Sequence, residues 1–331
     1  MTDNPNMTQN IKSFFIVGAP RCGTTAMARY LGKHPNICFA KPKETHYFLF
    51  SRPDLSPEAQ RQQFLDAYFP NLSSETLTIG EGAVSTLYSK DALQRILNSF
   101  ESPKFIVMLR DPVELIRSYH ARLLHLRQEN EEDLPTAWGL QEERSHGRHI
   151  PRNCQDPRVL QYREIARLGF YSRQLLDLVG AENCMPLFFD DFLDDTLSSY
   201  KNVLQFLDIP YDGRVEFKRV NSASKYKSGL LQSIYSGPLL RPVANQLLRN
   251  PIRAAQLQRG LRKLRKKVKR INAVDATPLP LDPVFAAELR ERFADDLKVL
   301  GRTFDRDLTN WTTGRTNASK SSKSPQKNLR V

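Results

Sequence analysis

FFIVGAPRCGTT (residues 14–25) begins with four apolar, β-prone residues and runs on into a loop that contains glycine. Residues 24–33 have helix-forming character. A short apolar strand that passes through a glycine loop into a helix is typical of a phosphate-binding loop. The pattern therefore predicts strand, loop and helix in that order.

The loop GAPRCGTT (residues 18–25) differs from that of a nucleoside triphosphatase. It has the GxxxxG-x-[ST] spacing, but Thr24 stands where such an enzyme has lysine. Backbone N–H groups at Cys22, Gly23, Thr24 and Thr25 can still cradle a phosphate at the start of a helix, and Arg21 supplies a cation. We expect a ligand with a 5′-phosphate and one further small anionic group, not a triphosphate with magnesium. A simple strand-to-helix turn is the plain alternative.

The rest of the chain alternates strands with helices. Apolar runs predict strands at 77–80, 104–109 and 185–189, and helical patterns cover 111–127, 163–179, 197–207 and 283–300. Residues 129–157, rich in charge, histidine and proline, are expected to form a surface loop or an insertion. Alternation of this kind predicts an α/β fold with a parallel sheet covered by helices on both faces.

A second constellation follows the apolar run at 104–109. Arg110 comes directly after the run, where a phosphate-loop kinase would be expected to place an aspartate that holds magnesium. Ser118 lies a little over two helical turns further on. An arginine and a hydroxyl at the carboxyl ends of the strands suit a second, separate phosphate. Taken alone, Arg110 has the alternative of capping a neighbouring element.

The net charge of +13 is concentrated in two segments. Residues 241–270 hold eleven Arg or Lys and no acid, and residues 314–331 hold five more with no acid. Removing these sixteen charges from +13 leaves −3 for the rest of the chain, so the body is close to neutral. Leu257, Leu261, Leu264, Val268 and Ile271 form an apolar stripe on a predicted basic helix at 252–271. The helix either docks on an anionic surface or packs on the body as a lid.

Composition limits the remaining classes. The four cysteines have no CxxC spacing, which favours neither a zinc site nor a disulfide framework, and no metal is expected. The first residues lack the pattern of a secretory signal, and no apolar run reaches the ~18 residues of a membrane span. We expect a cytoplasmic protein with room for peripheral contact at an anionic membrane. Nucleic acid is not expected as a partner, because aromatic residues do not interleave with the basic ones.

Together the two phosphate motifs, GAPRCGTT and LRDPVELIRSY, strongly resemble the 5′-phosphosulfate and 3′-phosphate motifs of sulfotransferases that use 3′-phosphoadenosine 5′-phosphosulfate. The likeness is to the branch with heparan sulfate and tyrosylprotein sulfotransferases. Weaker similarity continues at Gly80, Glu81, Ser85 and Tyr88, at 188–192 and 206–207, and at 289–300 and 305–311. The resemblance implies a P-loop NTPase-like sheet, here with a basic helical insertion near the C-terminus. We expect a flexible segment at 1–13 and a disordered basic tail at 314–331. Between them lies one domain at 14–313, which contains the insertion or lid at 222–273.

The resemblance also implies catalytic residues in KPKETHYF (residues 41–48). Glu44 matches the family's catalytic base, and a carboxylate near the donor can take the proton of an attacking hydroxyl. Lys43 and Arg21 can neutralise charge on the bridging oxygen as the donor bond breaks. His46 is a rival base, since histidine side chains titrate near neutral pH.

The chain departs from the family pattern at two places. Several relatives have lysine at the position of Arg21, and arginine cannot donate its proton, so Arg21 is assigned electrostatic stabilisation only. The usual KGR-type loop is missing, and Lys225 is the substitute that the sequence offers.

The implied function is transfer of a sulfuryl group from 3′-phosphoadenosine 5′-phosphosulfate, without a metal, to a hydroxyl or amine of a glycan, lipid or small molecule. A peptide tyrosine is also compatible, because acceptor choice depends on loops. The alternatives are a phosphate-loop kinase and a basic module that binds membrane or nucleic acid.

Overall fold

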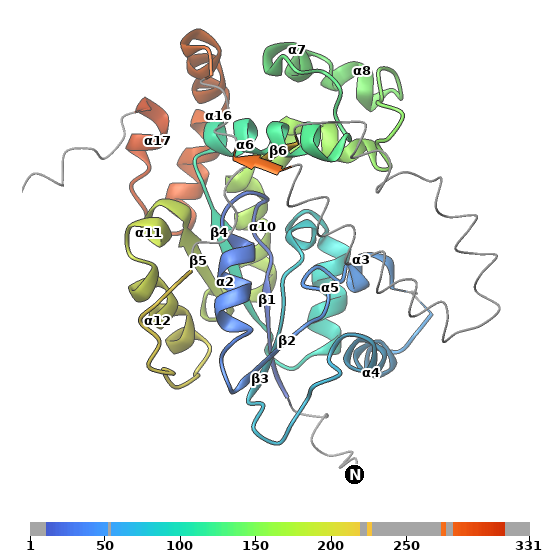
Figure 1. Cartoon of the computed structure of the whole chain (residues 1–331), viewed down its shortest axis with the longest axis vertical. Coiled ribbons are helices and arrows are strands. Elements are labelled where there is room, and N and C mark those ends of the chain that lie inside the picture. Colours follow the sequence, from blue (N-terminus) through green and yellow to red (C-terminus); the bar gives the residue numbers. More distant parts are fainter. Residues whose placement is uncertain (1–10, 52–53, 219–223, 227–272, 276–280, 315–331) are drawn as a thin grey trace, which may run out of the picture.

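A parallel five-stranded sheet forms the centre of the molecule in the computed structural model, which describes residues 11–51, 54–218, 224–226, 273–275 and 281–314 (Figure 1). The strands are β1 (Lys12–Ile16), β2 (Ile37–Phe39), β3 (Thr78–Glu81), β4 (Lys104–Leu109) and β5 (Cys184–Phe188). Their order is β2-β3-β1-β4-β5, and every neighbouring pair is parallel. The predicted fold class is confirmed.

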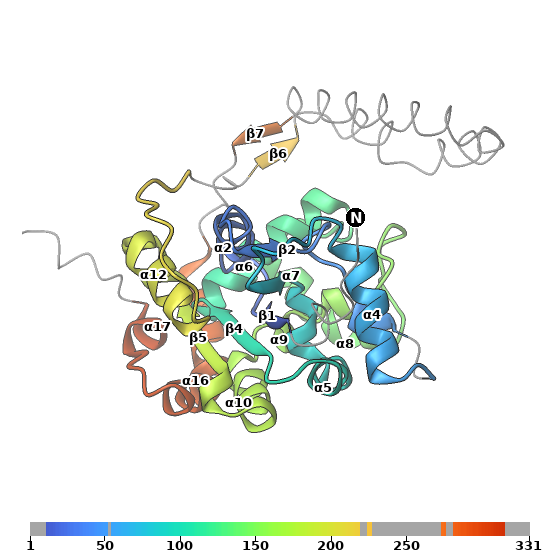
Figure 2. The same cartoon turned by 90° about the horizontal axis from the view of Figure 1, so that it is seen from below.

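Helices cover both faces of this sheet. The described helices of the chain are α2 (Thr24–Leu31), α3 (Tyr47–Phe50), α4 (Pro57–Tyr68), α5 (Lys90–Ser99), α6 (Pro112–Leu126), α7 (Leu134–Gly139), α8 (Gln141–Ser145), α9 (Tyr162–Ile165), α10 (Leu168–Val179), α11 (Phe189–Asp194), α12 (Thr196–Phe206), α16 (Pro283–Thr303) and α17 (Thr309–Thr313). Short 3₁₀ turns are η1 (Val84–Tyr88), η2 (Pro157–Leu160) and η3 (Ala181–Asn183). Figures 1 and 2 show α2 and α12 on one face, α5 and α10 on the other, and α6 across the carboxyl ends of the strands.

Local signals explain why the central elements form where they do. Five of the six residues of β4 are buried, as its continuous apolar run requires for a strand covered on both faces. Asp111 then caps α6, since its side chain accepts a hydrogen bond from the amide of Val113 at 2.8 Å, and Pro112 takes the first helical position. The strand therefore passes directly into a helix.

Several elements differ from the sequence prediction. The first strand begins at Lys12, two residues earlier than expected, and β2, α4 and α5 were not predicted. The helix expected at 163–179 is broken into α9 and α10, because α16 crosses at Gly169. A Cβ on Gly169 would lie 2.0 Å from the carbonyl oxygen of Asp296, whose side chain accepts from the amides of Gly169 and Phe170 at 2.7 and 2.9 Å.

The prediction of a surface loop at 129–157 is wrong. This region contains α7 and α8 and a fully buried ion pair in which Arg144 donates to both oxygens of Glu129 at 2.7 and 2.8 Å. Tyr162 donates to the same carboxylate at 2.7 Å. Burial alone would raise the pKa of Glu129, but the hydrogen bonds from Arg144, Tyr162 and two backbone amides lower it. Charged residues that satisfy one another can be buried, and composition does not reveal their pairing.

Some predictions fall outside the described residues. These are the flexible segment up to residue 10, nearly all of the insertion at 222–273 with its helix at 252–271, and the tail from 315. Of the insertion only β6 (Ser224–Tyr226) and the start of β7 (Ala273–Asp275) are described, and the two strands pair antiparallel. Within the described ranges, no helix is both long enough and apolar enough to cross a bilayer.

Candidate active site

The GAPRCGTT loop lies between β1 and α2, at the carboxyl end of the central strand (Figure 1). Gly18 lets the backbone run against β4, because a Cβ there would lie 2.1 Å from the amide nitrogen of Met108. Gly23 is the N-cap of α2 and adopts a φ of 84°, a conformation that favours glycine. The loop thus ends at a helix N-terminus, where N–H groups without intrahelical partners are directed at any bound anion.

Arg21 is joined to the second constellation. Its Nε donates to the Oγ of Ser118 at 3.0 Å, and Nη1 of Arg110 donates to its carbonyl oxygen at 3.3 Å. The structure therefore brings Arg21, Arg110 and Ser118 together, although Arg21 and Ser118 are 97 residues apart in the chain.

Arg21 is half-buried and has other cations close to it. Burial lowers the pKa of Arg21, and the positive charges of Arg122 and Arg110 lower it further. A cationic cluster of this kind is stabilised by an anion placed among the three side chains.

Arg110 is held in place by an aromatic ring and a carboxylate. Its guanidinium lies 4.7 Å from the centroid of the Phe189 ring, and its Nη2 lies 3.4 Å from Oε2 of Glu114. Glu114 also pairs with Arg117 at 2.5 Å. These contacts fix the direction of Arg110 while leaving its remaining N–H groups for a ligand.

The two threonines and the cysteine of the loop have different surroundings. Oγ1 of Thr24 accepts from Nζ of Lys43 at 3.3 Å, and Thr25 is half-buried at the start of α2. Cys22 is buried, and burial raises the pKa of its thiol to about 12. Its side chain is therefore neutral and packs in the core, so only its backbone amide is a candidate for phosphate binding.

The KPKETH loop (residues 41–46) carries the predicted catalytic residues beside the phosphate loop. Nζ of Lys43 lies 2.8 Å from Oε1 of Glu44, and Oε2 of Glu44 lies 4.0 Å from Nε2 of His46. Nδ1 of His46 forms a hydrogen bond of 2.9 Å with Oγ of Ser85. Glu44 and His46 have side-chain exposures of 42% and 39%, so both rival bases can reach an acceptor from solvent.

Glu81 is a residue of this site that the sequence analysis did not assign a role. It is the last residue of β3 and only 3% exposed. Its carboxylate accepts from the amide and the hydroxyl of Thr45, in the middle of the KPKETH loop. The signal available in the sequence was an acid at the end of an apolar strand, where a buried carboxylate needs partners.

Arg122 is a second residue without a predicted role. It is exposed on α6, four residues after Ser118, and its charge acts on Arg21. The i, i+4 spacing from Ser118 was the signal that could have found it. Lys225 lies in β6, where only the backbone is described, so its predicted role stays a prediction.

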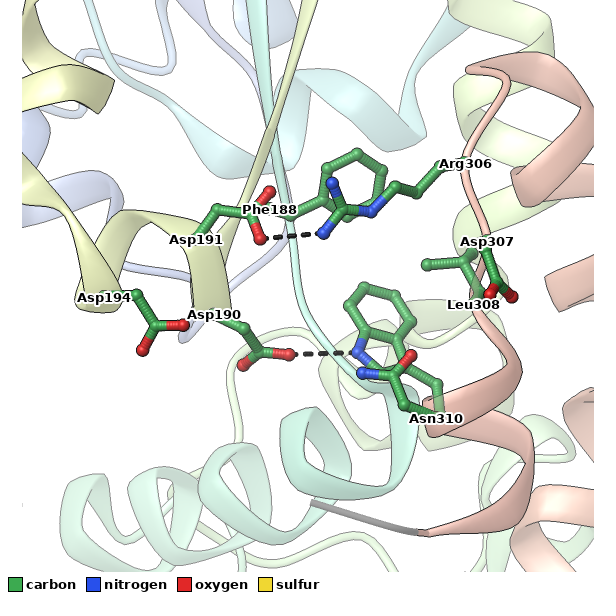
Figure 3. A pocket seen from close by; sticks show the side chains of 9 residues that line it. Phe188, Asp190, Asp191, Asp194, Arg306, Asp307, Leu308 and Asn310 are labelled. Carbon is green, nitrogen blue, oxygen red and sulfur yellow. Dashed lines mark hydrogen bonds and ion pairs between the residues drawn. The ribbon is translucent and has the colours of Figure 1, made fainter. Parts of the chain in front are cut away.

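A pocket lies between α11 and the C-terminal segment (Figure 3), lined by Phe188, Asp190, Asp191, Asp194, Arg306, Asp307, Leu308, Asn310 and Trp311. Nε1 of Trp311 donates to Asp190 at 3.0 Å, and Nη2 of Arg306 donates to Asp191 at 2.7 Å. On its other side α11 presents Phe189 and Phe192 to Gly23. The pocket contains none of the predicted site residues. The two hydrogen bonds to Asp190 and Asp191 nevertheless join the C-terminal segment to α11, whose phenylalanines lie against the phosphate loop at Gly23.

Among the described residues, no three His, Cys, Asp or Glu side chains are gathered in a way that could hold a metal ion. Asp111, the acid next to Arg110, is engaged in capping α6, and burial raises its pKa to about 6.

Comparisons with known proteins all find sulfotransferases. The model of the sulfotransferase family matches residues 13–213. The membrane-associated sulfotransferase kil1 of Dictyostelium discoideum is 28% identical in a match that covers 35% of this chain and 24% of that protein. The carbohydrate sulfotransferase 15 of Homo sapiens is 30% identical over 32% of this chain and 26% of that protein. The match thus spans about a quarter of the length of these curated relatives.

A solved structure supports the fold. The crystal structure of a sulfotransferase from Alicyclobacillus acidocaldarius superimposes with a TM-score of 0.62 and 21% identity, and the match covers 91% of this chain and 98% of that one. At this identity the likeness concerns the fold alone.

Proposed function

This chain belongs to the sulfotransferase family, and from that membership we propose that it transfers a sulfuryl group from 3′-phosphoadenosine 5′-phosphosulfate to a hydroxyl or amine of an acceptor. The phosphate loop with Arg21 takes the 5′-phosphosulfate. Arg110 and Ser118 take the 3′-phosphate, with Arg122 close by.

The observation that carries the proposal is the cluster around Arg21. The charges of Arg110 and Arg122 both act on Arg21 in the phosphate loop, and Ser118 on α6 accepts a hydrogen bond from Arg21. The phosphate loop ends at the N-terminus of α2, and Arg110 and Ser118 lie against Arg21 beside it. These two neighbouring groups of donors suit a ligand with two separate phosphate groups better than one continuous triphosphate. Lys43, which contacts Thr24 at the start of α2, adds a cation on the acceptor side.

The KPKETH loop supplies the chemistry at the acceptor. Glu44 takes the proton from the acceptor hydroxyl as its oxygen attacks sulfur from the side opposite the leaving phosphate. The bond between sulfur and the bridging oxygen breaks, and its electron pair stays with the nucleotide phosphate. Lys43 and Arg21 stabilise the charge that develops on that oxygen. Arg21 does this without giving up a proton.

The proposal extends to the acceptor class and the cellular site. A carbohydrate is the first acceptor class to test, because one of the relatives is named a carbohydrate sulfotransferase. Peripheral contact with an anionic membrane is supported by the eleven basic residues without an acid at 241–270, and by the name of the relative from Dictyostelium. The contact would not prevent action from the cytoplasmic side.

Calorimetry with 3′-phosphoadenosine 5′-phosphate tests the donor. We expect binding without magnesium, and weaker binding of ATP. Tighter binding of ATP, or an absolute need for magnesium, would replace the sulfotransferase proposal with the kinase. A screen of extracts with radiolabelled donor and purified protein then identifies the sulfated acceptor.

A further inference from the structure

We infer that Glu81 is a positioning residue that sets the place of the catalytic loop, holding Glu44 and His46 at the donor through the hydrogen bonds it accepts from Thr45. The inference rests on the proposed function, in which the KPKETH loop carries the base. Glu81 itself touches neither rival base and acts through the residue between them.

Three donors converge on the Glu81 carboxylate. Oε1 accepts from the amide of Thr45 at 3.0 Å and from its hydroxyl at 3.1 Å, and Oε2 accepts from the amide of Ala83 at 3.0 Å. The amide of the next residue, Gly82, donates to the carbonyl of Lys43 at 3.1 Å. The end of β3 therefore binds the loop at Lys43 and at Thr45, the residues on either side of Glu44.

The buried strand β3 holds the Glu81 carboxylate in a fixed place. All four residues of β3 are buried, and in the register with β1 Glu81 lies opposite Phe15. A Cβ on Gly82 would lie 3.0 Å from Cε of Lys43, so the lysine side chain passes close to the chain at this glycine. The same turn of chain supplies Ser85, the partner of His46. Loop residues 43, 45 and 46 therefore all take their position from one segment, 81–85.

An ionised carboxylate is the side chain that suits these donors. Glutamine in its place would turn an NH₂ group toward at least one N–H or O–H donor, which breaks one of the contacts. The charged side chain that acts on Glu81 is Lys43, while Glu44 and His46 follow along the loop. Burial raises the pKa of Glu81 to about 7 in spite of the hydrogen bonds and Lys43, which lower it. The hydrogen bonds from Thr45 to Glu81 should therefore strengthen as the pH rises through neutrality, because the carboxyl group becomes ionised.

Hydrogen exchange of the full-length protein tests the hydrogen bond from the Thr45 amide to Glu81, and it does not require the acceptor to be known. We expect the amide of Thr45, after correction for the intrinsic rate, to be better protected at pH 8 than at pH 6. In Glu81→Gln its protection at pH 8 should fall about tenfold or more, since a hydrogen bond to a charged group is lost. Glu44→Gln is the matched control and should leave the protection unchanged. Equal protection of Thr45 in wild type and Glu81→Gln at both pH values would overturn the inference.

A second pair of variants leaves Glu81 and the sheet intact. Thr45→Ala removes the hydroxyl that donates to Glu81, and Thr45→Ser retains it. With radiolabelled donor, the rate of sulfate release to water should fall severalfold in Thr45→Ala and stay near wild type in Thr45→Ser, with the KM for the donor unchanged in both. Equal rates in the two variants, or a change confined to KM, would contradict a positioning role.

The two proposals fail in different ways. If the wild-type protein does not bind 3′-phosphoadenosine 5′-phosphate, the proposed function is wrong. The exchange comparison at Thr45 then still measures how firmly Glu81 holds the loop. If the nucleotide binds and Glu81→Gln has no effect on the loop, the proposed function stands and the role of Glu81 is wrong.

Discussion

Replacing Glu81 by glutamine should change how the stability of the fold depends on pH. Glu81 is almost fully buried, and burial raises its pKa from 4.5 to about 7. Glutamine has a similar size and does not titrate in this range. The difference in the free energy of unfolding between wild type and Glu81→Gln therefore isolates the titration of this one group.

The sign follows from proton binding. Between pH 4.5 and about 7 the folded protein keeps the proton on Glu81, whereas the unfolded chain has lost it. The folded state binds more protons, so stability falls as the pH rises through this range and stays constant above it. A difference of about 2.5 pH units, at about 1.4 kcal/mol per unit, corresponds to a loss of about 3 kcal/mol.

Urea unfolding followed by tryptophan fluorescence, at pH 5 and pH 8, measures this loss. We expect the stability of wild type relative to Glu81→Gln to be lower at pH 8 than at pH 5 by about 2–3 kcal/mol, because part of the loss has already occurred at pH 5. Other carboxyls titrate in both proteins, so their contributions cancel. Glu101→Gln, which changes an exposed glutamate, is the control and should show a constant difference. A constant difference for Glu81→Gln would refute the assigned burial and pKa.

Three further results are expected. Arg110→Ala should weaken binding of 3′-phosphoadenosine 5′-phosphate by about 1.5–3 kcal/mol, measured by calorimetry, because a charge-assisted contact is lost; an unchanged affinity would remove Arg110 from the nucleotide site. Glu44→Gln should lower kcat about 10²–10⁴-fold with nucleotide affinity nearly intact, and if it keeps near wild-type rates while His46→Ala does not, the base is His46. In sedimentation with liposomes, binding through 252–271 should be seen with anionic lipid at low salt and lost at high salt; equal partitioning onto neutral lipid, or no binding, would leave that segment without a membrane role.

The fold and the grouping of Arg21, Arg110 and Ser118 could be predicted from the sequence because their signals are local. The phosphate loop, the apolar run at 104–109 and the cap at Asp111 each occupy a few consecutive residues. Their order along the chain then fixes a parallel arrangement, because a strand followed by a helix returns to the same sheet in the same direction. Arg21 and Ser118 are far apart in sequence, yet each follows a strand, so both could be expected at the same edge.

The parts that were missed depend on pairing between distant residues. Glu129 and Arg144 looked like surface charges, and only the folded chain shows that each satisfies the other away from water. Glu81 was read as part of a strand motif, since nothing in its neighbourhood identifies Thr45 as its partner 36 residues away. A single sequence gives the chemical type of such residues but not the contact that gives them a role.

The sheet order explains why the proposed donor and acceptor sides of the site lie next to each other. β1 lies between β3 and β4, so the phosphate loop at its end is flanked by Glu81 on one side and Arg110 on the other. Neighbouring strands are ~4.8 Å apart, which places the ends of β3 and β4 ~10 Å from each other across the loop. That distance matches a site in which one strand positions the base loop and another holds the far phosphate. Substitutions on the β3 side should therefore affect turnover and those on the β4 side nucleotide affinity, because each group acts on a different end of the same bound donor.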